Sequence, residues 1–321
     1  MSNTTIHGGR MARLIDDTGE GWYHVYNRVA CEKDRMPFDE ITQAKETFEQ
    51  YLNFYTEAYC CEVATYVVMG NHYHLVLRME PFKEFSKDEL KERAKLFYPN
   101  TFDLTNRWSE AHWEQFNQRL FNLADLMRNI QQGFARWFNK AAKRRGRFWA
   151  DRFKSTILYG EESLVECMQY VDLNPIRAGL VDRPEDYIYG GFSKRMCGEG
   201  HNLYELKGLL SIRSSNKALE HYRSMLYTRG SIRNKEGTIE IKEVVFDLEM
   251  KQNFNLSLRE ESKDHFRFYV DGLVIGAEDK VQDWLRRLKD SGTYLRRKNP
   301  IPIKEGLEWF SVREQRSHFE G

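Results

Sequence analysis

The sequence predicts an α+β protein built on an antiparallel β-sheet with helices on one face. Two observations predict this class. Short segments rich in aromatic and β-branched residues alternate along the chain with segments whose apolar residues recur at helical spacing. Their order is strand, helix, strand, strand, excursion, helix, strand, helix, which suits an antiparallel sheet packed against helices.

The first elements can be placed from their patterns. Residues 22–29 (WYHVYNRV) predict a strand, and residues 39–55 predict a helix with Phe48 and Leu52 on its apolar side. Residues 62–78 predict a strand pair interrupted near Gly70 and Asn71.

The following segments predict a polar excursion and two helices. Residues 80–106 are mixed and polar, with a helical part at 87–97, and residues 113–142 show a long apolar stripe at helix spacing. The chain then turns at Gly146 into a predicted strand, and residues 161–174 predict a short helix. Pro175 marks the end of that helix, because the residue before a proline disfavours the helical conformation.

The length of 321 residues predicts two domains, or one domain with an appendage. We expect a catalytic domain at 1–197, with an insertion at about 80–112, and a mostly helical C-terminal extension at 198–321 whose role the sequence does not indicate. Helical patterns occur in that extension at 205–210, 217–226 and 278–289.

The composition is that of an ordinary soluble protein, with 41% hydrophobic and 30% charged residues. No apolar run is long enough for a membrane span and the start has no signal-peptide pattern, so we expect a cytoplasmic protein without a membrane partner. The five cysteines include no C-x-x-C pair, which fits reduced, buried thiols and argues against a disulfide framework or a zinc finger.

Two histidines lie one residue apart in the second predicted strand of the pair. Side chains alternate between the faces of a strand, so His72 and His74 point to one face and Tyr73 to the other. Two imidazoles side by side begin a metal site. The short pattern also fits two ordinary surface histidines, but the apolar residues on both sides favour a central strand, which is a rigid platform for ligands.

The helix predicted at 161–174 carries a polar face. Glu166, Tyr170 and Asn174 follow at helical spacing, so a phenol and an amide oxygen lie one turn apart. This spacing suits the delivery of a nucleophile and a third metal ligand to one point. The alternative is a tyrosine at the edge of the core and an asparagine that caps the helix end.

Together the two motifs resemble a known family. VMGNHYHLVL, followed about 100 residues later by QYVDLNPIRAGLV, is similar to the IS200/IS605-type tyrosine (HUH) transposases. The similarity is greatest to the branch associated with repetitive extragenic palindromes (REP), which GRFWADRFKS and DRPEDYIYGGFS also resemble. The resemblance covers about residues 21–192, and both the 80–106 excursion and the later chain exceed the small members.

The resemblance implies a ferredoxin-like catalytic domain that acts on single-stranded or hairpin DNA. It implies that His72, His74 and Asn174 hold Mg²⁺ or Mn²⁺ and that Tyr170 is the nucleophile of an endonuclease and strand transferase with a 5′-phosphotyrosine intermediate. Ligand chemistry alone would favour Mn²⁺ or Zn²⁺ for two imidazoles. Glu166, on the same face of the predicted helix, is a candidate for the supporting base that would activate the Tyr170 phenol. A monomer or a homodimer both remain open, with the monomer favoured.

The distribution of charge fits a nucleic-acid partner better than the net charge of +1 does. Residues 128–158 contain nine basic residues and one acid, a local charge of +8. This local excess matters because phosphate contacts act over short range in salt. The predicted DNA-binding residues are Arg28, Arg144, Arg145, Arg147, Trp149, Arg152, Lys154 and Arg177.

Three alternatives accompany this hypothesis. The basic stretch also fits a solvated helix end followed by a packed strand, and either Phe148 or Trp149 must then belong to the core. The protein could bind a nucleic-acid hairpin without cutting it. It could also be a metal hydrolase that uses water, in which case Tyr170 would be dispensable for cleavage.

Overall fold

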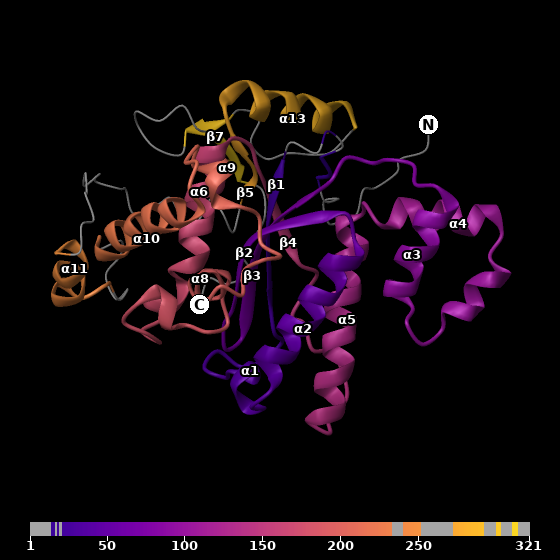
Figure 1. The fold of residues 1–321 in the computed structure, drawn as a ribbon, viewed down its shortest axis with the longest axis horizontal. Helices are drawn as coiled ribbons and strands as arrows, with labels where there is room; N and C mark the ends of the chain where they lie inside the picture. Colours follow the sequence, from indigo (N-terminus) through magenta and orange to yellow (C-terminus); the bar gives the residue numbers. More distant parts are fainter. Residues whose placement is uncertain are drawn as a thin grey trace, which may run out of the picture.

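The computed structural model describes residues 14–16, 18, 21–232, 240–251, 272–291, 300–302 and 310–313. In this part of the chain, seven strands form one sheet in the order β2-β3-β1-β4-β5-β7-β6 (Figure 1). The strands are β1 (Trp22–Arg28), β2 (Cys61–Val68), β3 (His72–Met79), β4 (Lys154–Leu158), β5 (Gly272–Gly276), β6 (Ile301–Pro302) and β7 (Phe310–Arg313).

The first four strands form the expected antiparallel unit. β1 lies between β3 and β4 and is antiparallel to both, and β2 pairs with β3 at the edge. Helix α2 (Ala44–Ala58) joins β1 to β2, and helix α5 (Leu123–Ala141) lies between β3 and β4. This β-α-β-β-α-β order with these neighbours is the ferredoxin-like arrangement, and the predicted α+β class is confirmed.

Helices cover both faces of this sheet, so the prediction of helices on one face is wrong. α2 and α5 lie together on one side, and α6 (Glu161–Asp172) lies on the other (Figure 1). The cause is that β1 and β3 bury side chains on both faces. Tyr23 and Leu75 face a core shared with α2 and α5, whereas Trp22 and Val76 face a second core shared with α6.

The long helix predicted at 113–142 is two helices, α4 (Glu110–Arg119) and α5. The break falls at Asn122, whose side chain accepts a hydrogen bond from the Asp125 backbone N–H and so caps the start of α5. α3 (Lys87–Phe97), the 3₁₀ turn η1 (Phe102–Arg107) and α4 share a small core of their own. The predicted insertion therefore corresponds to a helical unit beside the sheet.

The chain after residue 197 contributes strands as well as helices. The helical patterns at 205–210, 217–226 and 278–289 match α9 (Leu206–Leu209), α10 (Ser215–Ser231) and α13 (Glu278–Asp290). β5 pairs in parallel with β4, so the extension continues the sheet of the first part. The remaining helices in the described residues are α1 (Pro37–Glu40), α7 (Asn174–Arg177), η2 (Pro184–Asp186), α8 (Gly191–Met196) and α11 (Glu243–Met250). None of the described helices has the length and apolar character that crossing a membrane requires.

A buried carboxylate fixes the rotation of α6 about its axis. The Thr65 hydroxyl of β2 donates to Asp172 Oδ1 at 2.6 Å, and the Tyr222 hydroxyl of α10 donates to Asp172 Oδ2 at 2.7 Å. Asp172 therefore ties the last turn of α6 both to the sheet and to the C-terminal part of the chain. Burial raises its pKa to about 6, and the two hydroxyl donors oppose that rise.

This raised pKa predicts a pH dependence of stability. An unfolded aspartate titrates near pH 4, so between about pH 4 and pH 6 the folded protein holds a proton that the unfolded chain has lost. The contribution of Asp172 is therefore most favourable below pH 4 and declines by about 3 kcal/mol as the pH rises through 6. Asp172→Asn should lose this decline.

The measurement is chemical denaturation of both proteins at several pH values from 4 to 7. The wild type should lose stability relative to Asp172→Asn as the pH rises. Asp103→Asn, at an exposed position, is the matched control and should follow the wild type. Equal pH profiles for Asp172→Asn and the wild type would contradict the assignment.

Candidate active site

The sheet register brings the two histidines onto the face that α6 covers. His74 pairs with Tyr26, and His72 pairs with Arg28, across the β1–β3 ladder. Directly paired residues of an antiparallel ladder point to the same face of the sheet. His24 lies two residues before Tyr26 on β1, so it points to the same face. The predicted orientation of His72 and His74, away from Tyr73, agrees with this register, since Tyr73 belongs to the opposite core.

Tyr170 on α6 meets this face of the sheet. Its ring centroid lies 5.4 Å from that of His74 and 5.8 Å from that of His24, and the rings are nearly perpendicular in both contacts, at 84° and 90°. Tyr170 is half-buried and packs against the core between α6 and the sheet. The two motifs, which are distant in sequence, are thus in contact.

Each histidine of the pair is held through its Nδ1 atom. His72 Nδ1 lies 2.8 Å from Asn71 Oδ1, and an amide oxygen only accepts, so His72 Nδ1 donates and its Nε2 carries a lone pair. His74 Nδ1 lies 2.9 Å from His24 Nε2. Protein partners on the second ring nitrogen are characteristic of histidines that bind metals through the first.

Burial keeps both imidazoles neutral. The pKa of His72 is lowered to about 4 by burial and by the nearby Arg28 guanidinium. The pKa of His74 is lowered well below its usual range by burial, with additional repulsion from His24 and His72. Neutral imidazoles at physiological pH retain the lone pair that binds a cation.

Asn174 begins α7, directly after α6. Its Nδ2 donates to the Tyr170 carbonyl at 2.8 Å, which is the local helix-end bond that the alternative interpretation predicted. This bond uses the amide nitrogen and leaves the amide oxygen as the chemically suitable ligand atom. Among the residues that the structure describes, no three His, Cys, Asp or Glu side chains are arranged to hold a metal. Two imidazoles with an amide oxygen are nevertheless a donor set that fits a divalent cation.

Two residues of β1 belong to the site and were not predicted as functional. The Tyr26 ring lies 4.9 Å from His74 and 5.7 Å from His72, centroid to centroid, so a second phenol stands beside the pair. His24 is buried and contacts both His74 and Tyr170. His24, Tyr26 and Arg28 lie two residues apart, so the sequence places them on one face of β1. That this face is also the face of His72 and His74 is shown by the β1–β3 register.

The basic segment, residues 144–154, lies at the end of the sheet where β3 begins and forms its basic edge. The Ala30 N–H donates to the Phe148 carbonyl, and the Ala150 N–H donates to the Arg28 carbonyl, so the segment is attached to the end of β1. Lys154 pairs with Tyr26 and shares the face of the histidines. Four of the predicted DNA contacts lie near this end. Arg145, Arg147 and Arg152 are exposed, and Arg144 is half-buried.

One predicted DNA contact, Trp149, is contradicted by the structure, and another, Arg177, is hydrogen-bonded within the protein. Trp149 is buried, and its indole N–H donates to the Gln131 carbonyl at 3.0 Å, so its ring is not available to stack on a base. Phe148 is buried as well, so both aromatics belong to the core. The Arg177 guanidinium donates to the carbonyls of Arg229 and Gly230, which commits it to the end of α10.

Glu166 also faces the C-terminal part of the chain. Its carboxylate lies 4.0 Å from Arg229 Nη2, and its carbonyl accepts from Arg229 Nη1. Arg229 Nη1 donates to Gln169 Oε1 at 2.7 Å in addition. This buried arginine thus braces α6 against α10, and the candidate supporting role of Glu166 in catalysis stays a prediction.

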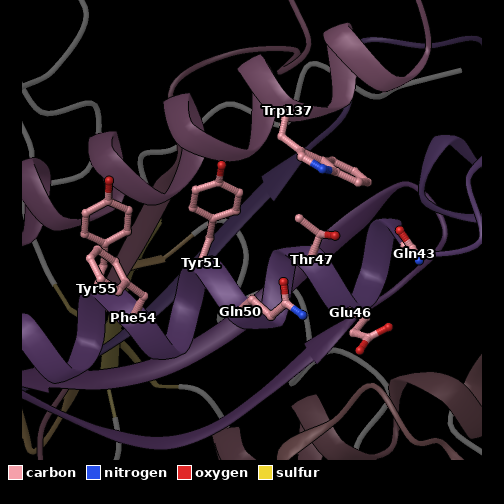
Figure 2. Close-up of a pocket in the computed structure, with 8 residues that line it drawn as sticks. All are labelled: Gln43, Glu46, Thr47, Gln50, Tyr51, Phe54, Tyr55 and Trp137. Carbon is pink, nitrogen blue, oxygen red and sulfur yellow. The ribbon is translucent and has the colours of Figure 1, made fainter. Parts of the chain in front are cut away.

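A pocket of about 470 Å³ lies elsewhere on the molecule, between α2 and α5 (Figure 2). It is lined by exposed parts of both helices, including the rings of Tyr51, Tyr55 and Trp137. Both helices cover the face of the sheet opposite to His72 and His74. The sheet therefore separates this pocket from the histidine site, and its residues do not contribute to that site.

Comparison with known proteins adds little to this geometry. No family model matches the chain, and no curated protein matches it. A solved structure of a REP-associated tyrosine transposase bound to a REP hairpin is similar, with a TM-score of 0.39 and 12% identity over 62% of this chain and 88% of that chain. A similarity this distant supports no conclusion about the chemistry of this chain.

The burial of Trp149 predicts that its loss is a folding defect. Trp149→Ala removes a buried indole that contacts Tyr73 and Phe48, so the free energy of unfolding should fall by about 3–5 kcal/mol. Denaturant titration of this variant measures that decrease, and DNA binding by its remaining folded fraction should match the wild type. Unchanged stability with weakened binding would restore Trp149 as a DNA contact.

Proposed function

We propose that the protein is a metal-dependent endonuclease and strand transferase for single-stranded or hairpin DNA, with Tyr170 as its nucleophile. The observation that carries this proposal is the contact of Tyr170 with His74, beside a second neutral imidazole and a basic edge of the sheet. A phenol that can form an ester, ligands for a cation and charges for phosphates thus gather at one place.

The proposed reaction is an exchange of phosphate esters. The Tyr170 oxygen attacks a DNA phosphorus atom, the bond from phosphorus to the 3′-oxygen breaks, and the protein becomes joined to the 5′-phosphate. The phenol gives up its proton, and the departing 3′-oxygen takes one up. Because the ester bond is retained in the phosphotyrosine, the 3′-hydroxyl of another strand can reverse the step and become joined.

His72, His74 and the Asn174 oxygen are the residues that would hold Mg²⁺ or Mn²⁺. A divalent cation, when bound there, neutralises charge on the phosphate. Without any cation, the half-buried position of Tyr170 against two imidazoles already restricts its ring. In this proposal His72 and His74 present the ligand atoms, whereas His74 and His24 define where the phenol can lie.

Two other functions make different demands on the site. A metal hydrolase that uses water needs the histidines but not the Tyr170 hydroxyl. A hairpin-binding protein without catalysis needs the basic edge of the sheet but neither the histidines nor Tyr170. The presence of two neutral imidazoles, and of a phenol that contacts one of them, His74, favours strand transfer over either alternative.

The test is capture of the covalent intermediate on labelled oligonucleotides that carry a hairpin flanked by single strands, in Mn²⁺. The proposed polarity joins Tyr170 to the 3′ fragment, so a 3′-label should appear on the protein and a 5′-label on a released strand. Tyr170→Phe keeps the ring and removes the hydroxyl, and it should abolish the adduct.

Tyr26→Phe is the matched control, because Tyr26 is the other phenol beside the imidazole pair. It should still form the adduct. An adduct absent in Tyr26→Phe and present in Tyr170→Phe would assign the nucleophile to β1 instead. Cleavage that persists in Tyr170→Phe without any adduct would establish hydrolysis, and hairpin binding without cleavage would leave only a binding function.

The exposed arginines of the basic segment predict the salt dependence of binding. In a complex with single-stranded DNA, each arginine that neutralises a phosphate adds about 0.7 to the steepness of log K against log[salt]. Arg145→Ala and Arg147→Ala should each make the dependence shallower by that amount without altering the cleavage rate at saturating DNA. Binding assays at several salt concentrations measure it, with the exposed Arg107 as the control position. A slope equal to that of the wild type would exclude these two residues from the DNA interface.

A further inference from the structure

His24 and His74 meet nitrogen to nitrogen inside the protein. His24 Nε2 lies 2.9 Å from His74 Nδ1, while the ring centroids are 5.1 Å apart and the ring planes differ by 6°. Centroids so much farther apart than the contacting atoms mean that the rings meet edge to edge. Both side chains are almost completely buried, with 1% and 2% exposure.

This contact requires one proton between the two nitrogens. If His24 Nε2 donates, then His74 Nδ1 accepts and the single proton of neutral His74 sits on Nε2, which cannot bind a cation. If His74 Nδ1 donates, its Nε2 carries a lone pair. The choice between these two arrangements therefore decides whether His74 is able to be a ligand.

At His72 the position of the ring proton follows from the hydrogen-bond partner. There the partner is Asn71 Oδ1, which only accepts, so the His72 proton sits on Nδ1. A cation that uses both residues of the pair needs His74 in the same form. Within the described part of the chain, His24 is the side chain that hydrogen-bonds the His74 ring, so the proton position at His74 depends on His24.

We infer that His24 is a positioning residue whose Nε2 accepts a hydrogen bond from His74 Nδ1 and thereby leaves His74 Nε2 as a ligand atom. This inference rests on the proposed function for the identity of the ligand, a divalent cation. His24 does not itself bind the cation, because its Nε2 accepts from His74 Nδ1 and the Nδ1 of the neutral His24 ring then carries the proton. Its perpendicular contact with Tyr170 also lets it restrain the phenol from the same position.

The experiment compares two substitutions that differ in one property. His24→Gln retains an oxygen that accepts from His74 Nδ1, whereas His24→Leu fills similar space without an acceptor. His201→Leu, at an exposed position, is the control. Mn²⁺ titration, followed by the electron paramagnetic resonance signal of the free ion, measures cation binding without any turnover.

We expect affinity for Mn²⁺ to fall about 10–100-fold in His24→Leu, as is usual when the partner of a metal-binding histidine is removed. His24→Gln should remain within a few-fold of the wild type. Nitrogen-15 NMR of the histidine rings should show His74 protonated at Nδ1 in the wild type and no longer held in that form in His24→Leu. Circular dichroism identifies any variant that fails to fold. If His24→Leu does not fold, the Mn²⁺ affinity and the His74 ring protonation are compared between His24→Gln and the wild type.

Each result has a distinct meaning for the two proposals. Wild-type Mn²⁺ affinity in His24→Leu, His74 protonated at Nε2 in the wild type, or absence of Mn²⁺ binding by the wild type would overturn the role of His24. Weakened binding in His24→Leu, together with no DNA adduct from the wild type, would support His24 and refute strand transfer. An adduct from the wild type, together with unchanged Mn²⁺ affinity in His24→Leu, would support strand transfer and refute the role of His24.

Discussion

The burial of polar rings between the sheet and α6 is the constraint on which the rest of the site depends. A buried imidazole must have hydrogen-bond partners, because an unpaired polar group in the interior is costly. Asn71 and His24 supply those partners for His72 and His74. The same burial keeps the imidazoles neutral, and a neutral imidazole has the lone pair that the proposed cation would need.

The position of α6 follows from a second set of buried polar contacts. Asp172 binds Thr65 and Tyr222, and Arg229 binds Gln169, so the helix that carries Tyr170 is held by β2 and by α10. Polar contacts of this kind are directional, and they define the rotation of a helix more narrowly than apolar packing does. The chain after residue 197 thus has a structural part in the site, since α10 belongs to it.

The elements and the main motifs were predictable from the sequence because they depend on local patterns. The strands, the histidine pair and the Tyr170 face follow from periodicities of two and of about 3.6 residues. The face of the sheet that α6 covers did not follow, since the pattern of a strand indicates burial on both sides without indicating which helix covers each side. Trp149 was misassigned for the same reason, because an aromatic residue in a basic segment has the same local pattern whether it packs inward or outward.

The residues that the sequence missed are those whose meaning depends on register. His24 and Tyr26 acquire a role only when β1 lies beside β3 with Tyr26 opposite His74. A shift of one residue would turn both to the other face, and His24 would then enter the aromatic core shared with α2 and α5. The bulky apolar residues Tyr23 and Val25 prevent this shift, because they are buried in that core. The packing on one face of β1 thereby determines the chemistry on the other.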